Sequence, residues 1–223
     1  RGLPCTALGL SSSFTMSLDF RGEWLHLHAR PDGPGLWCSK EAATVPPASP
    51  SWEHHLRGAV LEGIRQQGFD RVLEMNFFEK TPYQPGGATL VFELTGRNAN
   101  VILLRRSDGR ILASMRKVLS SVSRYRTVSP GVPYKRPPSS GHPPGEWGTP
   151  QVQRLLADCS GPGVLYGHLE GVGPVSAKAI ISHSKDVAGT VKDLGKMLIQ
   201  GDFTPWETPF GPVPVPLGTG RPV

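Results

Sequence analysis

The sequence predicts an α+β protein, with an antiparallel β-rich domain followed by a helix-hairpin-helix domain. Short apolar runs separated by turn signals fill the first two thirds of the chain, and apolar residues at helical spacing fill most of the remainder. Glycine and proline are also abundant, with 27 and 23 among 223 residues, against a usual combined share of roughly 12%. This composition predicts many turns and disfavours a helical bundle.

Two groups of strands are expected in the first domain, residues 1–140. Thr15 to Phe20 and Trp24 to His28 alternate in strand fashion around a tight Arg21-Gly22 turn, which predicts a hairpin. Four further runs predict a compact antiparallel meander, in which Asp108-Gly109 forms a hairpin turn. These runs are Val72 to Phe77, Leu90 to Leu94, Val101 to Leu104 and Ile111 to Met115.

One helix is expected within this domain, near residues 51–66. Ser51 is a suitable N-cap after a proline-rich break, and Leu56, Val60, Leu61 and Ile64 recur at helical spacing.

A Gly/Pro-rich linker, residues 141–150, is predicted to lead into the helix-hairpin-helix domain, residues 151–200, in which Gln151 to Asp158 and Val187 to Gln200 are expected to be helices. Its hairpin is the run LEGVGPVSAKAI, in which Gly171 and Gly173 allow a tight turn. The free amides that open the next helix can hold a phosphate, with Lys178 nearby, although a plain helix connection is equally consistent with the pattern. Residues 201–223 are predicted to form a Pro-rich extended tail.

The net charge of +6 and the pI of about 9.5 suggest a polyanionic partner, with a merely basic protein as the alternative. Lys and Arg concentrate between Arg105 and Arg136, against Asp108 alone. Arg124, Tyr125 and Arg126, followed by Tyr134 and Lys135, interleave cations with aromatic rings, a composition that suits unpaired RNA.

Several other classes of site are not expected. The three widely spaced cysteines predict free thiols in a reducing compartment, and no run approaches the roughly 18 apolar residues of a membrane helix. His26 and His28 lack further ligands nearby, so solvent-facing histidines are favoured over a metal site. No catalytic motif is present, so we expect neither an enzyme nor a cofactor.

An ordered set of motifs resembles the N-terminal domain of the NFACT family, which includes RqcH-like ribosome quality-control factors and was long labelled fibronectin-binding protein A. The motifs are GFDR from Gly68, ELTGRNANVILL from Glu93, DGRIL from Asp108, SRYR from Ser123 and SPGVPY from Ser129. The sequence departs from the family at Asn98-Ala99, where His-Ser is usual, and shows no opening helix before Leu8. The resemblance implies a β-rich domain similar in fold to formamidopyrimidine glycosylases.

The resemblance implies a cytoplasmic chain that binds tRNA, alanyl-tRNA in particular, and obstructed large ribosomal subunits with stalled peptidyl-tRNA, supporting C-terminal alanine tailing. A DNA-binding or DNA-repair helix-hairpin-helix protein and a fibronectin-binding adhesin are the alternatives. Asp70 and Arg71 match the family's tRNA-engaging pair. The remaining tRNA-binding candidates are Arg97, Asn98, Asn100, Arg124 and Arg126, of which the two asparagines are equally suited to forming a turn.

One carboxylate is expected to be buried. Glu93 lies within an apolar strand, where an unpaired charge would be costly, so we expect it to pair with Arg71, Arg97 or Arg126.

Overall fold

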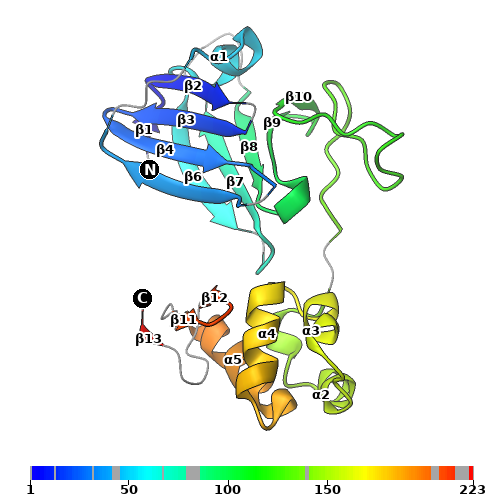
Figure 1. The fold of residues 1–223 in the computed structure, drawn as a ribbon. Helices are drawn as coiled ribbons and strands as arrows, with labels where there is room; N and C mark the ends of the chain where they lie inside the picture. The colour runs from blue at the N-terminus through cyan, green and yellow to red at the C-terminus, as the bar shows by residue number, and fades with distance from the viewer. Residues whose placement is uncertain are drawn as a thin grey trace. The chain divides into compact units, whose positions relative to one another are not determined.

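The computed structural model describes residues 2–12, 14–31, 33–41, 46–66, 68–78, 86–138, 141–201, 206–213 and 221–222. The chain divides into two compact units (Figure 1). The first unit comprises Arg1–Gln67 and Arg71–Pro137, and the second comprises Gly68–Asp70 and Pro138–Val223. Antiparallel sheets dominate the first unit and helices the second, which confirms the mixed α+β class.

A six-stranded antiparallel sheet carries most of the first unit, in the order β1-β6-β7-β8-β9-β10. Its last four strands run consecutively, which confirms the predicted meander. The strands are β1 Leu3–Pro4, β6 Val60–Gln66, β7 Val72–Phe78, β8 Ala88–Glu93, β9 Asn100–Arg105 and β10 Ile111–Ser114, with the short 3-10 helix η1, Gly96–Asn98, before β9.

A second antiparallel sheet of four strands has the order β2-β3-β4-β5. Its central pair is the predicted hairpin, now confirmed, with Thr15 opposite His28 and Phe20 opposite Glu23. Its strands are β2 Ala7–Ser12, β3 Thr15–Phe20, β4 Glu23–His28 and β5 Gly35–Ser39.

Side chains of both sheets form the main core of the first unit. Met75, Phe77 and Phe92 of the six-stranded sheet belong to one buried cluster with Met16 and Leu27 of the four-stranded sheet. The opposite face of the six-stranded sheet is also buried, because the chain that follows β10 contributes Val128 and Tyr134 to a second cluster with Val72, Val91 and Ile102. Polar residues on this second face therefore lie beneath a loop.

The helix predicted near residues 51–66 is confirmed in its first part and wrong in its second. Helix α1 spans Pro50–Leu56 only, burying Trp52 and Leu56, and residues 60–66 form β6. Gly58 takes a φ of 77° between the two elements, a conformation that ends the helix. Pairing with β7 then overrides the helical spacing, with Leu61 opposite Phe77 and Ile64 opposite Met75.

Four helices build the second unit, and two of the predicted helices are confirmed. Thr149 caps the first of them, accepting a hydrogen bond from the N–H of Val152, and the last has the predicted bounds. The helices are α2 Pro150–Ala157, α3 Pro162–His168, α4 Pro174–His183 and α5 Val187–Gln200. None of the helices in the described parts of the chain is both long and apolar enough to cross a membrane.

The segment predicted as a linker, residues 141–150, instead belongs to the second unit. It contains the 3-10 helix η2, Pro144–Glu146, and the side chain of Trp147 is 1% exposed within the helical core. The indole Nε1 of Trp147 donates to the carbonyl of His142 at 2.7 Å. A buried aromatic side chain gives this Gly/Pro-rich segment a fixed place, because removing its large apolar surface from water is favourable.

The predicted extended tail falls partly outside the described residues. Within them, β11 Trp206–Thr208, β12 Gly211–Val213 and β13 Arg221–Pro222 pair as a small antiparallel sheet.

Candidate nucleic-acid interface

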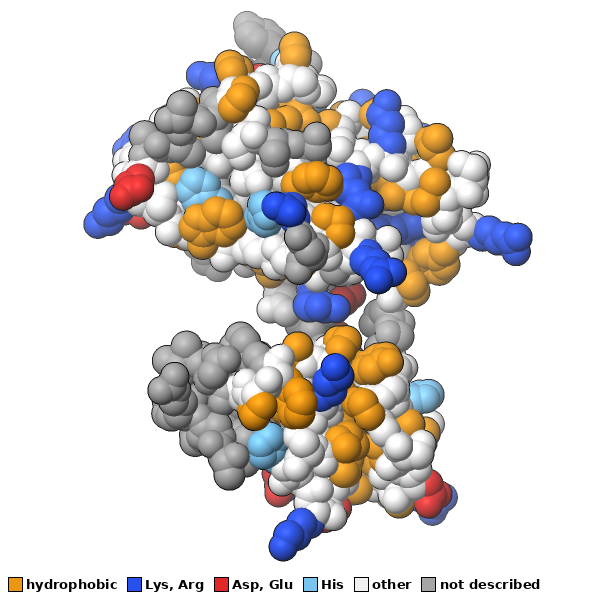
Figure 2. Space-filling model, viewed as in Figure 1, with side chains coloured by type: hydrophobic (Ala, Val, Ile, Leu, Met, Phe, Trp, Pro, Cys, Tyr) orange, Lys and Arg blue, Asp and Glu red, His pale blue; other side chains and the backbone are white. Residues whose placement is uncertain are grey.

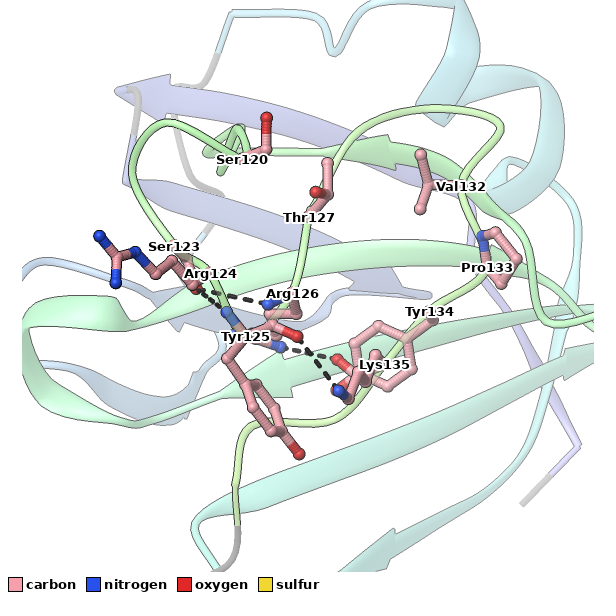
Figure 3. A pocket seen from close by; sticks show the side chains of 10 residues that line it. All are labelled: Ser120, Ser123, Arg124, Tyr125, Arg126, Thr127, Val132, Pro133, Tyr134 and Lys135. Carbon is pink, nitrogen blue, oxygen red and sulfur yellow. Dashed lines mark hydrogen bonds between the residues drawn. The ribbon is translucent and has the colours of Figure 1, made fainter.

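A cleft of about 470 Å³ lies in the first unit, where the loop after β10 folds over the six-stranded sheet (Figure 3). Two neighbouring segments of that loop, residues 120–127 and 132–135, line it. The lining residues are Ser120, Ser123, Arg124, Tyr125, Arg126, Thr127, Val132, Pro133, Tyr134 and Lys135.

A buried ion pair underlies this cleft. The Nη1 and Nη2 groups of Arg126 donate to the two carboxylate oxygens of Glu93 at 2.5 and 2.6 Å, and the Tyr134 hydroxyl donates to the same carboxylate at 2.8 Å. Glu93 is fully buried, so the predicted pairing is confirmed with Arg126 as the partner. Burial, and then the nearby Glu93 charge, raise the pKa of Tyr134 well above its ordinary value.

Arg126 is thereby corrected from a phosphate-binding candidate to a residue that positions the loop. Its side chain is 8% exposed, and its Nη1 also donates to the carbonyl of Lys135 at 3.1 Å. A guanidinium already held by a buried carboxylate has little capacity left for an external phosphate.

The rim of the cleft carries an exposed ring next to a cation. The Lys135 Nζ lies 3.8 Å from the centroid of the Tyr125 ring and donates to the Tyr125 carbonyl at 3.1 Å. Tyr125 is 46% exposed. In Figure 3 the Arg124 side chain extends away from Tyr134 and Lys135. The rim thus offers an aromatic face and cationic groups together.

Arg97 and Asn98 are exposed in the η1 turn, as a binding role requires, but Asn100 is not. The Asn100 side chain is 1% exposed, donates through Nδ2 to the Arg116 carbonyl at 2.8 Å and accepts from the Arg116 N–H at 2.9 Å. Its role is corrected to a structural one. Arg116 in turn donates through Nη1 to the Arg97 carbonyl at 2.7 Å, which fixes the turn that presents Arg97.

Much of the positive run between Arg105 and Arg136 is neutralised by carboxylates. Arg105 pairs with Asp108 at 3.0 Å, Arg106 with Glu62 at 2.5 Å, and Arg136 with Glu74. Among the described residues of the first unit, Arg97, Lys117, Arg124 and Lys135 are exposed and make no ion pair, and the last two line the cleft. Figure 2 shows Lys and Arg side chains gathered over the region of β10 and its following loop.

Asp70 and Arg71 fall on the division between the two units. Asp70 is half-buried and belongs to the second unit, whereas Arg71 is exposed and belongs to the first. The Arg71 carbonyl accepts a hydrogen bond from the Leu94 N–H at 2.8 Å, beside β8.

Two motifs that are remote in sequence meet in the second unit. The Glu170 carboxylate accepts a hydrogen bond from the Phe69 N–H at 2.9 Å. Gly171 has a φ of 81°, and a Cβ there would lie 3.0 Å from the Phe69 carbonyl oxygen. The Gly68–Asp70 segment therefore packs against the turn between α3 and α4. The sequence offered no signal for this contact beyond the acidic residue beside the glycines.

Gly171 is exposed in this turn, and its expected phosphate-binding role stays a prediction. Gly173 is the N-cap of α4, and a Cβ added there would meet no described atom within 4 Å. Lys178 is exposed on α4. A phosphate contact at these two residues stays a prediction.

One histidine of β4, His26, also differs from expectation. His26 is 7% exposed rather than solvent-facing, with Nδ1 2.9 Å from the Ser17 hydroxyl and Nε2 2.9 Å from the Ser39 hydroxyl. Burial lowers the pKa of His26. Among the residues that the structure describes, no group of three or more His, Cys, Asp or Glu side chains is placed to hold a metal ion.

Curated relatives share the name Rqc2 homolog RqcH. The chain is 32% identical to that of Bacillus subtilis (strain 168) over 143 residues, which cover 61% of this chain and 25% of the relative. It is 38% identical to that of Streptococcus suis (strain 05ZYH33) over 87 residues, covering 39% of this chain and 16% of the relative. These matches therefore span a quarter or less of the relatives' length.

Solved structures show the same fold. The N-terminal part of the fibronectin/fibrinogen-binding protein of Streptococcus suis superposes with a TM-score of 0.80 at 24% identity, covering 99% of this chain and 86% of that one. The fibrinogen binding protein of Staphylococcus aureus gives 0.75 at 19% identity, with coverages of 94% and 80%. The N-terminal domain of the fibronectin-binding protein PavA of Streptococcus pneumoniae gives 0.66 at 22%, with coverages of 100% and 87%.

A family model matches nearly the whole chain, over residues 11–213, and is described as the NFACT N-terminal and middle domains. The resemblance seen in the motifs is thus confirmed, and the chain belongs to the NFACT family.

Proposed function

We propose that this chain is the tRNA-binding N-terminal region of an RqcH-like ribosome quality-control factor. It acts in the cytoplasm, engages obstructed large ribosomal subunits and supports C-terminal alanine tailing of stalled chains. It supplies binding and positioning, and peptide transfer belongs to the ribosome. Membership of the NFACT family and the names of the curated relatives support this proposal.

The observation that carries the proposal is the set of exposed cations without ion pairs, of which Arg124 and Lys135 line the cleft with the exposed Tyr125 ring. Arg97, Lys117 and Arg124 can neutralise phosphates and release counterions, which gives affinity without sequence preference. Tyr125, with the Lys135 ammonium against it, offers a stacking face to an unpaired base. A folded RNA presents phosphates and unpaired bases together, whereas a regular duplex keeps the faces of its bases stacked inside.

The proposal gives separate roles to the other predicted residues. Asp70 and Arg71 contact tRNA as the family pair, and α3, the turn and α4 act as a helix-hairpin-helix whose open end is Gly173 with Lys178. The likeness of the β-rich unit to formamidopyrimidine glycosylases is part of the same proposal.

Fluorescence anisotropy with labelled tRNA(Ala), a non-cognate tRNA and a duplex DNA of matched length, across a salt series, tests the proposal. We expect tighter binding of tRNA than of DNA. Arg97→Ala, Lys117→Ala and Arg124→Ala should each weaken tRNA binding about threefold to tenfold and lower the salt slope by about one. Arg154→Ala, which removes an exposed cation of α2, is the control of equal charge.

Each alternative has its own readout. Equal binding of tRNA and DNA, with Arg154→Ala as damaging as the other variants, contradicts specific tRNA binding. Tighter binding of duplex DNA than of tRNA supports the DNA-binding helix-hairpin-helix alternative. The fibronectin-binding names of the structural neighbours motivate a third measurement, the binding of the chain to immobilised fibronectin at physiological salt. Nonspecific electrostatic attraction is screened at this salt concentration. Binding that persists there supports the adhesin alternative, and loss of binding counts against it.

A further inference from the structure

Among the residues that the structure describes, the four-stranded sheet of the first unit has one edge with which no strand pairs. At its other edge, β2 is covered, because the Leu10 N–H donates to the Pro46 carbonyl at 3.0 Å and Gly9 forms a bridge with Pro47. In the six-stranded sheet, β10 is covered by residues 131–133, and β1 is only two residues long. Strand β5 pairs with β4, and no other described strand pairs with it.

Strand β5 is also exposed and apolar, which is unusual for an edge. Leu36 and Trp37 are 37% and 46% exposed, and Cys38 is exposed as well. Natural sheets normally protect such an edge with a lysine, a proline, a bulge or a covering segment. Here Pro34 and Lys40 flank the strand, and no charge or proline lies within it. An unprotected edge of this kind is a template for another strand.

A row of aromatic rings adjoins this edge on the outer face of the sheet. The Trp37 ring stacks on His26 with centroids 5.0 Å apart and meets His28 edge-on at 6.1 Å, and Trp24 continues the row, 6.5 Å from His26. Figure 2 shows hydrophobic and histidine side chains side by side on the face where β4 and β5 lie. The row reaches solvent at Trp37, the central residue of β5.

Hydroxyl groups hold this row in place. Ser17 and Ser39 engage both nitrogens of His26, and Thr15 lies 2.6 Å from Nδ1 of His28. Fixed rings lose little conformational freedom when a ligand packs on them, which favours binding.

We propose that β5 is a docking edge for an extended peptide segment of a partner protein, which adds to the sheet as a fifth strand. The partner's main chain would bond the free edge of Gly35–Ser39. The side chain opposite Trp37 would be aromatic or β-branched, since such cross-strand pairs are favourable.

A strand fits this edge better than a polyanion does. The exposed charges where β4 begins and β5 ends are balanced, with Arg21 and Lys40 against Glu23 and Glu41. The backbone N–H and C=O groups along a sheet edge form hydrogen bonds with the backbone of another strand. This site therefore differs from the cationic cleft, and its test is independent of tRNA binding.

The test uses the whole chain and an acetylated, amidated heptapeptide of alternating Val and Thr with a central Tyr. Binding is followed by NMR, through shifts and hydrogen exchange of the amides of residues 35–39. We expect exchange at the free edge to slow at least tenfold at saturation. The same peptide with every backbone amide N-methylated, which removes the donors from both of its edges, should not bind.

Variants and rival occupants complete the test. Trp37→Lys and Leu36→Lys should each weaken peptide binding at least tenfold, whereas Ile64→Lys, at a 52% exposed residue of β6, should change it less than twofold. All three should bind tRNA like the parent. Equal binding of the N-methylated peptide, preference for a single-stranded RNA heptamer at these amides, or Trp37-dependent dimers in sedimentation would each overturn the proposal.

Discussion

Arg126 holds both carboxylate oxygens of Glu93, 33 positions away in the sequence, at 2.5 and 2.6 Å. The pair joins the end of β8 to the loop that forms the cleft. Because the Tyr134 hydroxyl shares the same carboxylate, one buried charge fixes both walls of the cleft.

We expect Glu93→Gln to destabilise the first unit by about 3–5 kcal/mol, because it leaves the Arg126 charge buried without a counter-charge. Glu62→Gln, which breaks the exposed pair with Arg106, should cost less than about 1 kcal/mol. Urea unfolding measures both. Equal costs for the two variants would show that the buried pair contributes no more than a surface pair.

The raised pKa of Tyr134 predicts a loss of stability at high pH. The contribution of Tyr134 to the free energy of unfolding is complete below the unfolded-state pKa of about 10. This contribution is lost as pH rises towards the higher folded-state pKa, because the unfolded chain then binds fewer protons than the folded chain. The urea midpoint of the parent should therefore fall more steeply above pH 10 than that of Tyr134→Phe. Tyr166→Phe, at a 46% exposed ring, should keep the parent's slope, and parallel slopes for all three would contradict the assignment.

Glu170 should matter as a hydrogen-bond acceptor and not as a charge. Glu170→Ala removes the acceptor of the Phe69 N–H, which we expect to cost about 1–2 kcal/mol, while Glu170→Gln keeps an acceptor oxygen and should cost less than half as much. Hydrogen exchange of the Phe69 amide reports the contact directly. An amide equally protected in Glu170→Ala and the parent would mean that other contacts hold the segment.

Gly195 in α5 should not tolerate alanine, although alanine is the better helix former. A Cβ there would lie 2.7 Å from the Pro144 carbonyl oxygen and 3.1 Å from the Trp147 ring, so we expect Gly195→Ala to destabilise the second unit by about 1–3 kcal/mol. Gly167→Ala in α3, where a Cβ meets nothing within 4 Å, should be neutral or stabilising by up to about 1 kcal/mol. Thermal unfolding of the parent and the two variants measures both effects. Equal unfolding temperatures for the two variants would contradict the prediction.

Local periodicity and turn chemistry were enough to predict several elements from the sequence. The β3–β4 hairpin, the meander from β7 to β10 and the bounds of α5 follow from alternation, the Asp108-Gly109 turn and apolar spacing. The sequence also showed that Glu93 needs a buried partner, since an unpaired carboxylate in an apolar strand is costly.

Long-range contacts, in contrast, follow from tertiary packing. Residues 60–66 became a strand because β7 offered backbone pairing, and Asn100 and Arg126 became structural because the loop after β10 buries them. The meeting of Phe69 with Glu170, and of Trp147 with Gly195, depends on chain segments that are remote in sequence. Local propensity does not predict such pairs, because they are stabilised by burial and hydrogen bonds that exist only once both segments are folded.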